Sequence, residues 1–299
     1  MSKIQDTEVR WGILGVGNVC EVKSAPAMNL VPNSKIAAVM RRSEEKVIDY
    51  AERHGVSKWY TSATDLINDP EVNAIYIATP PNAHLELAKL AAAAGKPVYV
   101  EKPMARTHAE CMEMIEVCEK ANVPLYVAYY RRELPHFIKI KELIEAGVLG
   151  EIRTVHINLK QTLKPQVISH VETNWRIDPQ IAGGGYFFDL ASHQLDLMDF
   201  FFGKITHAYG FASNQAKTYE AEDIVTGSFV FDSGVLGSGN WCFTTSSNAE
   251  IDETIIYGSK GAIRFATFGK GEFELDTDEK GIETFSFELP KHIQEPLIK

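Results

Sequence analysis

The sequence has few cysteines, no excess of basic residues and no long apolar run. Its four cysteines, Cys20, Cys111, Cys118 and Cys242, lack the spacing of a metal site and indicate reduced thiols in a cytoplasmic protein. A formal net charge of −10 argues against a nucleic-acid-binding surface, which needs a basic stripe. No uncharged apolar run is long enough to cross a bilayer, and the polar stretch 1–10 has no signal-peptide core. We therefore expect no nucleic-acid partner, no membrane partner and no metal.

The length and composition indicate a globular protein of two domains. The chain has 299 residues, which is more than one compact core usually holds, and 45% of them are hydrophobic. The pattern of strands and helices changes near residue 128. We therefore predict a nucleotide-binding domain over 6–128, and a substrate-binding and oligomerisation domain over 129–299.

Short apolar strands alternate with helical segments in the first part. Strands are expected at 9–14, 35–40, 59–60, 74–78, 98–100 and 125–128. Helices are expected at 18–30, 43–55, 65–68, 83–94 and 107–121, with Ser43 and Asn82 as N-caps. This alternation predicts an α/β fold with a doubly wound parallel sheet of the Rossmann type.

The second part reads as an α+β domain. Helices are expected at 137–146 and 186–202, and strands at 151–163, 207–213, 224–231, 235–241, 250–257, 262–267 and 271–276. Turn residues such as Asp232-Ser233-Gly234 separate neighbouring strands as in hairpins. We therefore predict a large, mostly antiparallel open sheet.

A glycine-rich turn follows the first strand. Gly15-x-Gly17-x-x-Cys20 has the context of a dinucleotide fingerprint, because it ends a strand and opens a helix at Asn18 and Val19. Gly15 permits the tight turn, Gly17 lets the backbone approach a pyrophosphate, and Cys20 is small enough for packing of the helix on the sheet. The alternative is a glycine turn without a ligand.

The end of the second strand bears on which dinucleotide binds. NAD-binding folds usually carry an acidic residue there for the ribose hydroxyls. This chain has Arg41, Arg42 and Ser43 instead, which suit a 2′-phosphate. We therefore favour NADP, with NAD possible. The alternative is two solvated arginines before a helix.

Two further loops follow strands of the predicted sheet. Ligands of such sheets bind beyond the carboxyl ends of the strands. Thr79-Pro80-Pro81-Asn82-Ala83-His84 ends the fourth strand, and Glu101-Lys102-Pro103 ends the fifth. An ammonium at Lys102 can polarise a hydroxyl or carbonyl beside a cofactor. His84 is interpreted as a packing or supporting residue.

A third group of polar residues lies in the second domain. Gly183-Gly184-Gly185 precedes Asp189 and His193, which are four residues apart on one face of the expected helix, and Asp196 continues that face. A carboxylate beside an imidazole can orient it and tune its pKa. The alternative is an ion pair on a helix surface.

Together these motifs resemble the glucose-fructose oxidoreductase/inositol dehydrogenase/MocA family (Gfo/Idh/MocA) over residues 9–267. The resemblance rests on the glycine turn, on the two strand-end loops, on Asn174-Trp175-Arg176, and on the run from Gly183 to His193. It implies a Rossmann domain followed by an open sheet often used in oligomers, here a homodimer or homotetramer. It also implies NAD(P)-dependent oxidation or reduction of a sugar, polyol or related diol, with catalytic residues at Lys102, Asp189 and His193.

The resemblance also implies roles for these residues. The expected cofactor-binding residues are Gly15, Gly17, Asn18, Val19, Arg41, Arg42, Thr79, Pro80, Asn82, His84, Glu101 and Lys102. In oxidation, His193 is the candidate base for the hydroxyl proton, Lys102 stabilises the oxygen, and Asp189 binds a neighbouring hydroxyl or orients His193. The alternative makes Lys102 the acid/base. Tyr129, Arg131, Trp175 and Arg176 are expected substrate contacts, although Trp175 fits the core equally well.

Two rival functions remain at this point. One is an NADP-binding sensor or regulator without catalysis, which has no need of the Lys-Asp-His set. The other is an enzyme acting on an aromatic dihydrodiol or a bile pigment. Similar proteins usually continue into a final helix, whereas this chain ends at Glu295-Pro296-Leu297-Ile298-Lys299. We expect either a shortened tail or an incomplete chain.

Overall fold

The computed structural model describes residues 7–163 and 174–299, so residue 6, where the first predicted domain begins, lies outside the described residues. The chain forms two compact units. Unit 1 contains Met1–Tyr130 and also includes two later segments, Gln180–Gly183 and Pro290–Lys299. Unit 2 contains Arg131–Pro179 and Gly184–Leu289. No helix among the described residues is long and apolar enough to span a membrane.

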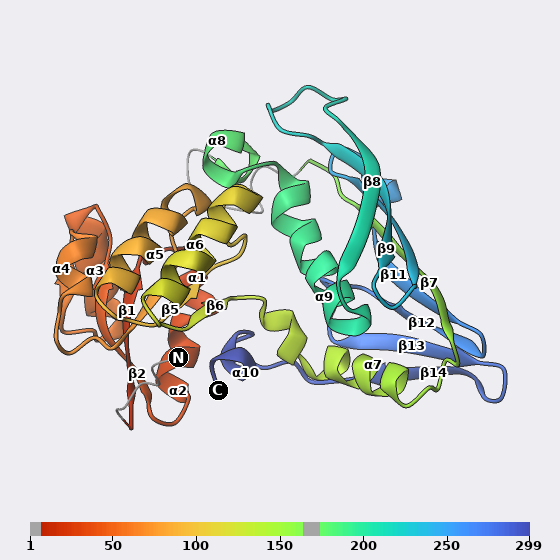
Figure 1. The fold of residues 1–299 in the computed structure, drawn as a ribbon, viewed down its shortest axis with the longest axis horizontal. Coiled ribbons are helices and arrows are strands. Elements are labelled where there is room, and N and C mark those ends of the chain that lie inside the picture. Colours follow the sequence, from red (N-terminus) through yellow and green to blue (C-terminus); the bar gives the residue numbers. More distant parts are fainter. Residues whose placement is uncertain (1–6, 164–173) are drawn as a thin grey trace. The chain divides into compact units, whose positions relative to one another are not determined.

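Unit 1 is built on a six-stranded parallel sheet in the order β3-β2-β1-β4-β5-β6 (Figure 1). Its strands are β1 (Val9–Leu14), β2 (Ser34–Met40), β3 (Trp59–Tyr60), β4 (Ala74–Ile77), β5 (Val98–Val100) and β6 (Leu125–Val127). The order reverses between β1 and β4, so the carboxyl ends of these two strands flank the switch point where such sheets bind ligands. The predicted Rossmann sheet is confirmed.

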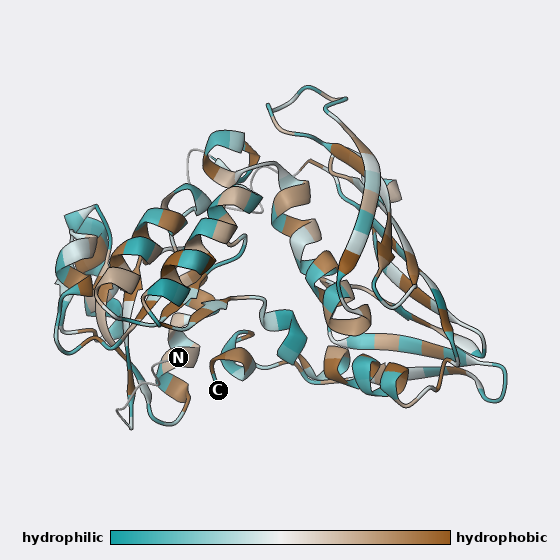
Figure 2. Cartoon of the chain, in the orientation of Figure 1, coloured by the Kyte–Doolittle hydropathy of each residue, from teal (hydrophilic) through white to brown (hydrophobic). Residues whose placement is uncertain are grey.

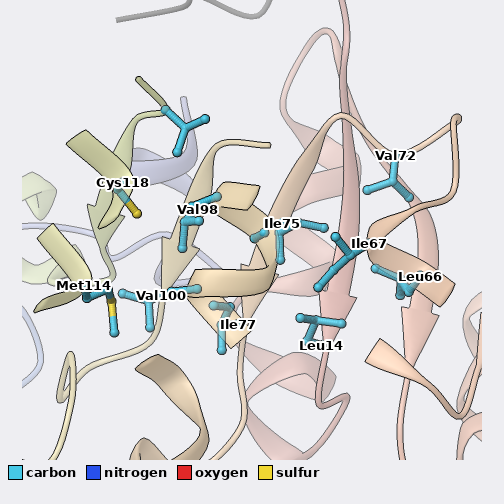
Figure 3. Packing of buried hydrophobic residues seen from close by; sticks show 14 of the residues in the cluster. Leu14, Leu66, Ile67, Val72, Ile75, Ile77, Val98, Val100, Met114 and Cys118 are labelled. Carbon is cyan, nitrogen blue, oxygen red and sulfur yellow. The ribbon is translucent and has the colours of Figure 1, made fainter. Parts of the chain in front are cut away.

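Helices cover both faces of this sheet. They are α1 (Asn18–Val22), α2 (Ala25–Leu30), α3 (Glu44–His54), α4 (Ala63–Ile67), α5 (His84–Ala93) and α6 (His108–Lys120). Buried side chains of α4, α5 and α6 pack on one face, and those of α1, α2 and α3 pack on the other. Figure 3 shows Val100 of the sheet beside Met114 of α6, and Val98 beside Cys118 of the same helix. Apolar and polar residues alternate along α5 and α6, as a helix with one buried side requires (Figure 2).

Two helix predictions for unit 1 need correction. The stretch 18–30 is not one helix, because α1 ends at Val22 and α2 starts at Ala25 with Pro26 in its first turn, where a missing N–H is tolerated. Asn82 is not an N-cap. It lies in a 3-10 turn, Pro81–Ala83, and α5 begins after Ala83. Ser43 is the N-cap of α3, as predicted, and Gly55 ends that helix in the left-handed conformation.

Unit 2 is built on an eight-stranded sheet in the order β14-β13-β12-β11-β7-β10-β9-β8, in which only the β7–β10 pair is parallel. The strands are β7 (Ile152–Lys160), β8 (Ile205–Ser213), β9 (Ile224–Phe231), β10 (Leu236–Cys242), β11 (Ile251–Gly258), β12 (Gly261–Phe265), β13 (Glu272–Thr277) and β14 (Gly281–Ser286). The predicted mostly antiparallel sheet is confirmed.

Two helices, α7 (Pro135–Glu145) and α9 (Ser192–Phe202), cover one face of this sheet. Phe137 of α7 and Phe201 of α9 both contact Phe265 of β12, with ring centroids 5.6 and 6.3 Å apart. The opposite face keeps large apolar side chains in solvent, among them Tyr209 and Phe211 of β8. Two short helices, α8 (Pro179–Ala182) and α10 (Glu295–Ile298), complete the α-helices of the described residues.

Candidate active site

The glycine turn joins β1 to α1 in unit 1. Gly15 has φ +93°, and a Cβ built on it would lie 3.0 Å from the backbone nitrogen of Thr79, so only glycine fits this position. A Cβ on Gly17 would meet only the Gly15 carbonyl oxygen, at 3.9 Å, which leaves the space over this residue open. The turn therefore offers a cradle that a side chain at Gly17 would fill, as a pyrophosphate-binding turn requires.

The residues after Gly17 divide into an exposed part and a packed part. Asn18 is exposed and Val19 half-buried, so both lie at the surface of the turn. Cys20 is fully buried in the core between helices and sheet, and burial raises the pKa of its thiol to about 12. It is an inert packing residue, which agrees with a small residue at the third fingerprint position.

The arginines at the end of β2 differ in their surroundings. Arg41 is half-buried and donates from Nη1 to the carbonyl oxygen of Val16 over 3.1 Å, so its guanidinium lies against the glycine turn. Arg42 is exposed. Ser43 caps α3 without a side-chain hydrogen bond to the helix, which keeps its hydroxyl available to a ligand. These three side chains can donate hydrogen bonds to an anionic group.

The buried side chain of His84 supports the loop after β4. This imidazole is fully buried, with Nε2 2.7 Å from the carbonyl oxygen of Thr79 and Nδ1 3.1 Å from that of Met104, and the single N–H of its neutral form donates to one of the two. Burial lowers the pKa of His84. Thr79 and Pro80 are half-buried and Asn82 is exposed. His84 therefore ties the loop after β4 to the loop after β5 from the interior of unit 1.

The loop after β5 carries a buried carboxylate next to Lys102. Glu101 is 8% exposed, and its Oε1 accepts hydrogen bonds from the Tyr76 hydroxyl and from Nε2 of Gln294, each over 2.7 Å. Its Oε2 accepts from the backbone nitrogen of Lys102 over 3.2 Å. Lys102 is half-buried, and Tyr129, at the end of β6, is half-buried too. Glu101 thus anchors the loop that presents Lys102.

Asp189 and His193 lie where α9 begins, in unit 2. The predicted single helix 186–202 is interrupted, because Phe187–Ala191 forms a π-helical turn and α9 starts at Ser192. In an α-helix, residues four apart such as Asp189 and His193 lie one above the other on the same face. The wider i→i+5 turn shifts them from this arrangement, and such turns are frequent at functional sites. Asp189 is 7% exposed and His193 is 4% exposed.

Asp189 lies beside Arg176 of the Asn174-Trp175-Arg176 motif. Arg176 Nε lies 3.3 Å from Asp189 Oδ2 and its guanidinium lies 4.4 Å from the centroid of the Trp175 ring. Asn174 donates from Nδ2 to the Tyr186 hydroxyl over 2.8 Å. Trp175 and Arg176 are half-buried. Unit 2 therefore brings three predicted residues, Asp189, Arg176 and Trp175, into one cluster.

Asp196 takes part in a different interaction. Its carboxylate makes a bidentate pair with Arg132, with distances of 2.6 to 2.9 Å. A bidentate pair of this kind holds the 3-10 turn that precedes α7 to α9. Asp196 is thus a structural residue, although it continues the polar face of the helix in the sequence.

His193 has an aromatic neighbour that the motifs do not include. The ring of Phe268 meets the imidazole edge-to-face, with centroids 6.0 Å apart. Arg131 is 8% exposed, donates to the carbonyl oxygen of Thr267 over 2.7 Å and lies 4.6 Å from the Phe268 centroid. Asp252 accepts hydrogen bonds from the backbone nitrogens of Thr267 and Phe268, at 3.2 and 2.6 Å. Arg131, a predicted substrate contact, therefore holds the loop that bears Phe268.

Sequence reasoning missed Gln294, Phe268 and Asp252. None belongs to a motif, and each acts through contacts with residues distant in sequence. The only sequence signal is the apolar pair Leu297-Ile298, which predicts that the tail is packed. Within the described ranges, no group of three His, Cys, Asp or Glu side chains is arranged to hold a metal ion.

The fold and the glycine turn define a dinucleotide-binding oxidoreductase. Residues 9–129 match the oxidoreductase family with an NAD-binding Rossmann fold, and residues 137–264 match the GFO/IDH/MocA C-terminal domain. The chain belongs to the Gfo/Idh/MocA family of oxidoreductases, as the motifs predicted.

Individual relatives agree with this membership. The chain is 42% identical over 295 residues to Oxidoreductase P35 of Formosa agariphila, covering 98% of this chain and 90% of that protein. It is 29% identical to the myo-inositol 2-dehydrogenase of Thermotoga maritima over 281 residues, or 91% and 79% of the two chains. The fold is similar to that of a levoglucosan dehydrogenase in complex with NADH and levoglucosan, with a TM-score of 0.84 at 24% identity over 97% and 82% of the chains.

Proposed function

We propose that the protein transfers a hydride between a nicotinamide cofactor and a secondary alcohol or ketone of a sugar, polyol or related diol. The observation that carries this proposal is the cradle over Gly17 in a chain that keeps Lys102, Asp189 and His193. The relatives named as myo-inositol and levoglucosan dehydrogenases support the polyhydroxylated substrate class. A regulator without catalysis has no need of these three residues.

Each residue has a defined task in this proposal. The bound nicotinamide supplies or takes the hydride. His193 removes the hydroxyl proton in oxidation, and Lys102 stabilises the negative charge that develops on the same oxygen. Asp189, held by Arg176, accepts a hydrogen bond from a neighbouring hydroxyl. The alternative, in which Lys102 itself moves the proton, predicts a smaller effect of changing His193.

The substrate contacts follow from the same clusters. Trp175 offers an aromatic face to the apolar side of a sugar ring, and Arg176 and Tyr129 offer donors to hydroxyl groups. Arg131 contributes by holding the Phe268 loop. The test of the function is oxidation of NADPH or NADH, followed by absorbance, on addition of ketoses, inosose and diketones. Turnover with none of these, but tight cofactor binding, would favour the regulator.

Gly17→Val is expected to abolish cofactor binding without unfolding the protein. The new side chain fills the cradle, whereas the extended backbone at Gly17 accepts a β-branched residue. We expect the cofactor Kd to rise by about a hundredfold or more, equal to about 2.7 kcal/mol. Loss of the glycine N-cap costs at most about 1 kcal/mol of stability. Calorimetric titration measures the Kd, and thermal melting of the cofactor-free protein measures the stability. An unchanged Kd would contradict the assignment of Gly17 to the cofactor site.

We further propose that the cofactor is NADP, contacted at its 2′-phosphate by Arg41, Arg42 and Ser43. The support is the exposed guanidinium of Arg42, the uncommitted Ser43 hydroxyl and the absence of a carboxylate at this strand end. The pyrophosphate would lie over Gly15, Gly17, Asn18 and Val19. Thr79, Pro80 and Asn82 would border the nicotinamide, with His84 and Glu101 supporting the two loops.

Arg42→Ala tests this selectivity. Removal of a charge-assisted contact is expected to lower kcat/KM with NADPH by about 10- to 100-fold. The kcat/KM with NADH should change by less than about twofold, because NADH lacks the 2′-phosphate that Arg42 is proposed to contact. NADH is thus the internal control, and an equal loss with both cofactors would assign Arg42 a structural role.

We also propose that the protein is a homodimer or homotetramer formed through the outer face of the unit 2 sheet. Tyr209 and Phe211 are 74% and 68% exposed, with ring centroids 5.4 Å apart, and Leu236 and Tyr257 are exposed on the same face. Exposed apolar patches of this kind mark protein interfaces.

We also propose a cytoplasmic location. The four cysteines are free thiols, which supports a reducing compartment.

Replacing both Tyr209 and Phe211 by serine is expected to shift the protein to monomers. Mass photometry at micromolar concentration measures this shift, and exposed Ile138→Ser on α7 is a matched control that should leave the mass unchanged. A monomeric wild-type protein would rule out this interface.

A further inference from the structure

The last ten residues of the chain fold back into unit 1. Pro290–Lys299 belong to this unit, and α10 contacts α2. Leu297 and Ile298 pack against the core formed by α1, α2, α3 and the sheet. Gln294, just before α10, is fully buried. A buried amide needs hydrogen-bond partners, so its environment shows what the segment contributes.

Both ends of the Gln294 amide are engaged. Nε2 donates to Glu101 Oε1 over 2.7 Å, and Oε1 accepts from the Tyr99 hydroxyl over 3.2 Å. A carboxylate only accepts hydrogen bonds, so the NH₂ group must face Glu101. Burial raises the pKa of Tyr99 well above its usual range, which keeps the phenol protonated as a donor. The amide therefore has one defined orientation.

Glu101 links this amide to the catalytic loop. A buried carboxylate is costly unless donors surround it, and Glu101 has three, from Tyr76, Gln294 and the Lys102 backbone. The first two hold Oε1, and the third joins Oε2 to the peptide from which the Lys102 side chain extends. The position of the carboxylate thus sets the backbone at Lys102, and Gln294 supplies a side-chain donor that holds it.

We propose that Gln294 is a positioning residue for the reaction, which acts through Glu101 to hold the backbone of Lys102. The inference rests on the proposed catalytic role of Lys102. It makes the tail of the chain part of the catalytic apparatus, because Gln294 acts through Glu101.

Gln294→Met tests the proposal, because it keeps the length of the side chain and removes both hydrogen bonds. We expect kcat to fall about tenfold or more, since small misplacements of a catalytic group can cost ~100-fold, while the cofactor KM stays within about twofold. The matched control is Leu297→Ala in the same tail, which removes apolar packing but no hydrogen bond. It should lower Tm and leave kcat near wild type.

A double variant separates positioning from a general structural role. Lys102→Ala with Gln294→Met should be no slower than Lys102→Ala alone, because Gln294 acts only through Lys102. Wild-type kcat in folded Gln294→Met, or losses that multiply in the double variant, would overturn the inference while the proposed function stands. Wild-type activity of Lys102→Ala would instead overturn the proposed function itself.

A second variant covers the case in which Gln294→Met does not fold. Tyr99→Phe keeps the ring and removes the donor to Gln294 Oε1. We expect kcat to fall about threefold, because the amide of Gln294 loses its hydrogen bond from Tyr99 but keeps the one to Glu101. An unchanged kcat in folded Tyr99→Phe would count against the proposal, and a fall confined to kcat would support it.

Discussion

Lys102→Ala is expected to lower turnover by at least about a hundredfold while the protein stays folded. The ammonium stabilises negative charge on the substrate oxygen, a contribution that exists mainly in the transition state and therefore appears in kcat. Folding should survive because the side chain is half-buried and Glu101, which anchors the loop, bonds the backbone nitrogen of Lys102. Steady-state kinetics at saturating cofactor measure the effect.

Lys120→Ala is the matched control for this variant. Lys120 ends α6 in the same unit, and its side chain is 72% exposed. Its replacement should leave kcat and KM at wild-type values. If Lys102→Ala retains near-normal turnover in folded protein, the assignment of Lys102 fails.

His193→Gln carries the second large expected effect. Removal of the base for the hydroxyl proton should lower turnover by about 10²–10⁴-fold. Glutamine preserves much of the volume of a side chain that is only 4% exposed, so the helix should remain packed against the Phe268 loop. His108→Ala at the exposed first residue of α6 is the control and should leave turnover unchanged.

The two catalytic assignments differ in the outcome for His193. With His193 as the base, both single variants lose activity to a similar degree. With Lys102 moving the proton, His193→Gln loses much less, and the imidazole becomes a binding group whose change raises KM. The comparison of kcat with KM for the two variants therefore decides between them.

Local patterns made most of the fold predictable. The strands of unit 1 are short runs of mostly apolar residues. Strands β4 and β5 are buried along their whole length, and central strands buried on both faces are apolar at nearly every position. Strand β9 begins at Ile224 and ends at Phe231 as expected, because its hairpin turn is explicit in Asp232-Ser233-Gly234. The strand β14 escaped prediction, since neither face of Gly281–Ser286 is buried and its hydrophobic alternation is weak.

The candidate site was predictable only where its residues follow strands or stand in motifs. Gly15, Lys102 and His193 can be found this way. The π-helical turn at Phe187–Ala191 has no signal in apolar spacing, because a single wide turn hardly changes the pattern. Gln294 and Asp252 act through hydrogen bonds to Glu101 and to the Phe268 loop, and such long-range pairs leave no trace in one sequence.

We propose that Lys102 and His193 act on one substrate oxygen beside the nicotinamide. A crystal structure of the ternary complex with NADP and a bound polyol or sugar measures this directly. We expect the Nζ of Lys102 and a ring nitrogen of His193 each within about 3 Å of the same hydroxyl oxygen. An oxygen that touches only one of these groups, with the other turned to solvent, would contradict the account.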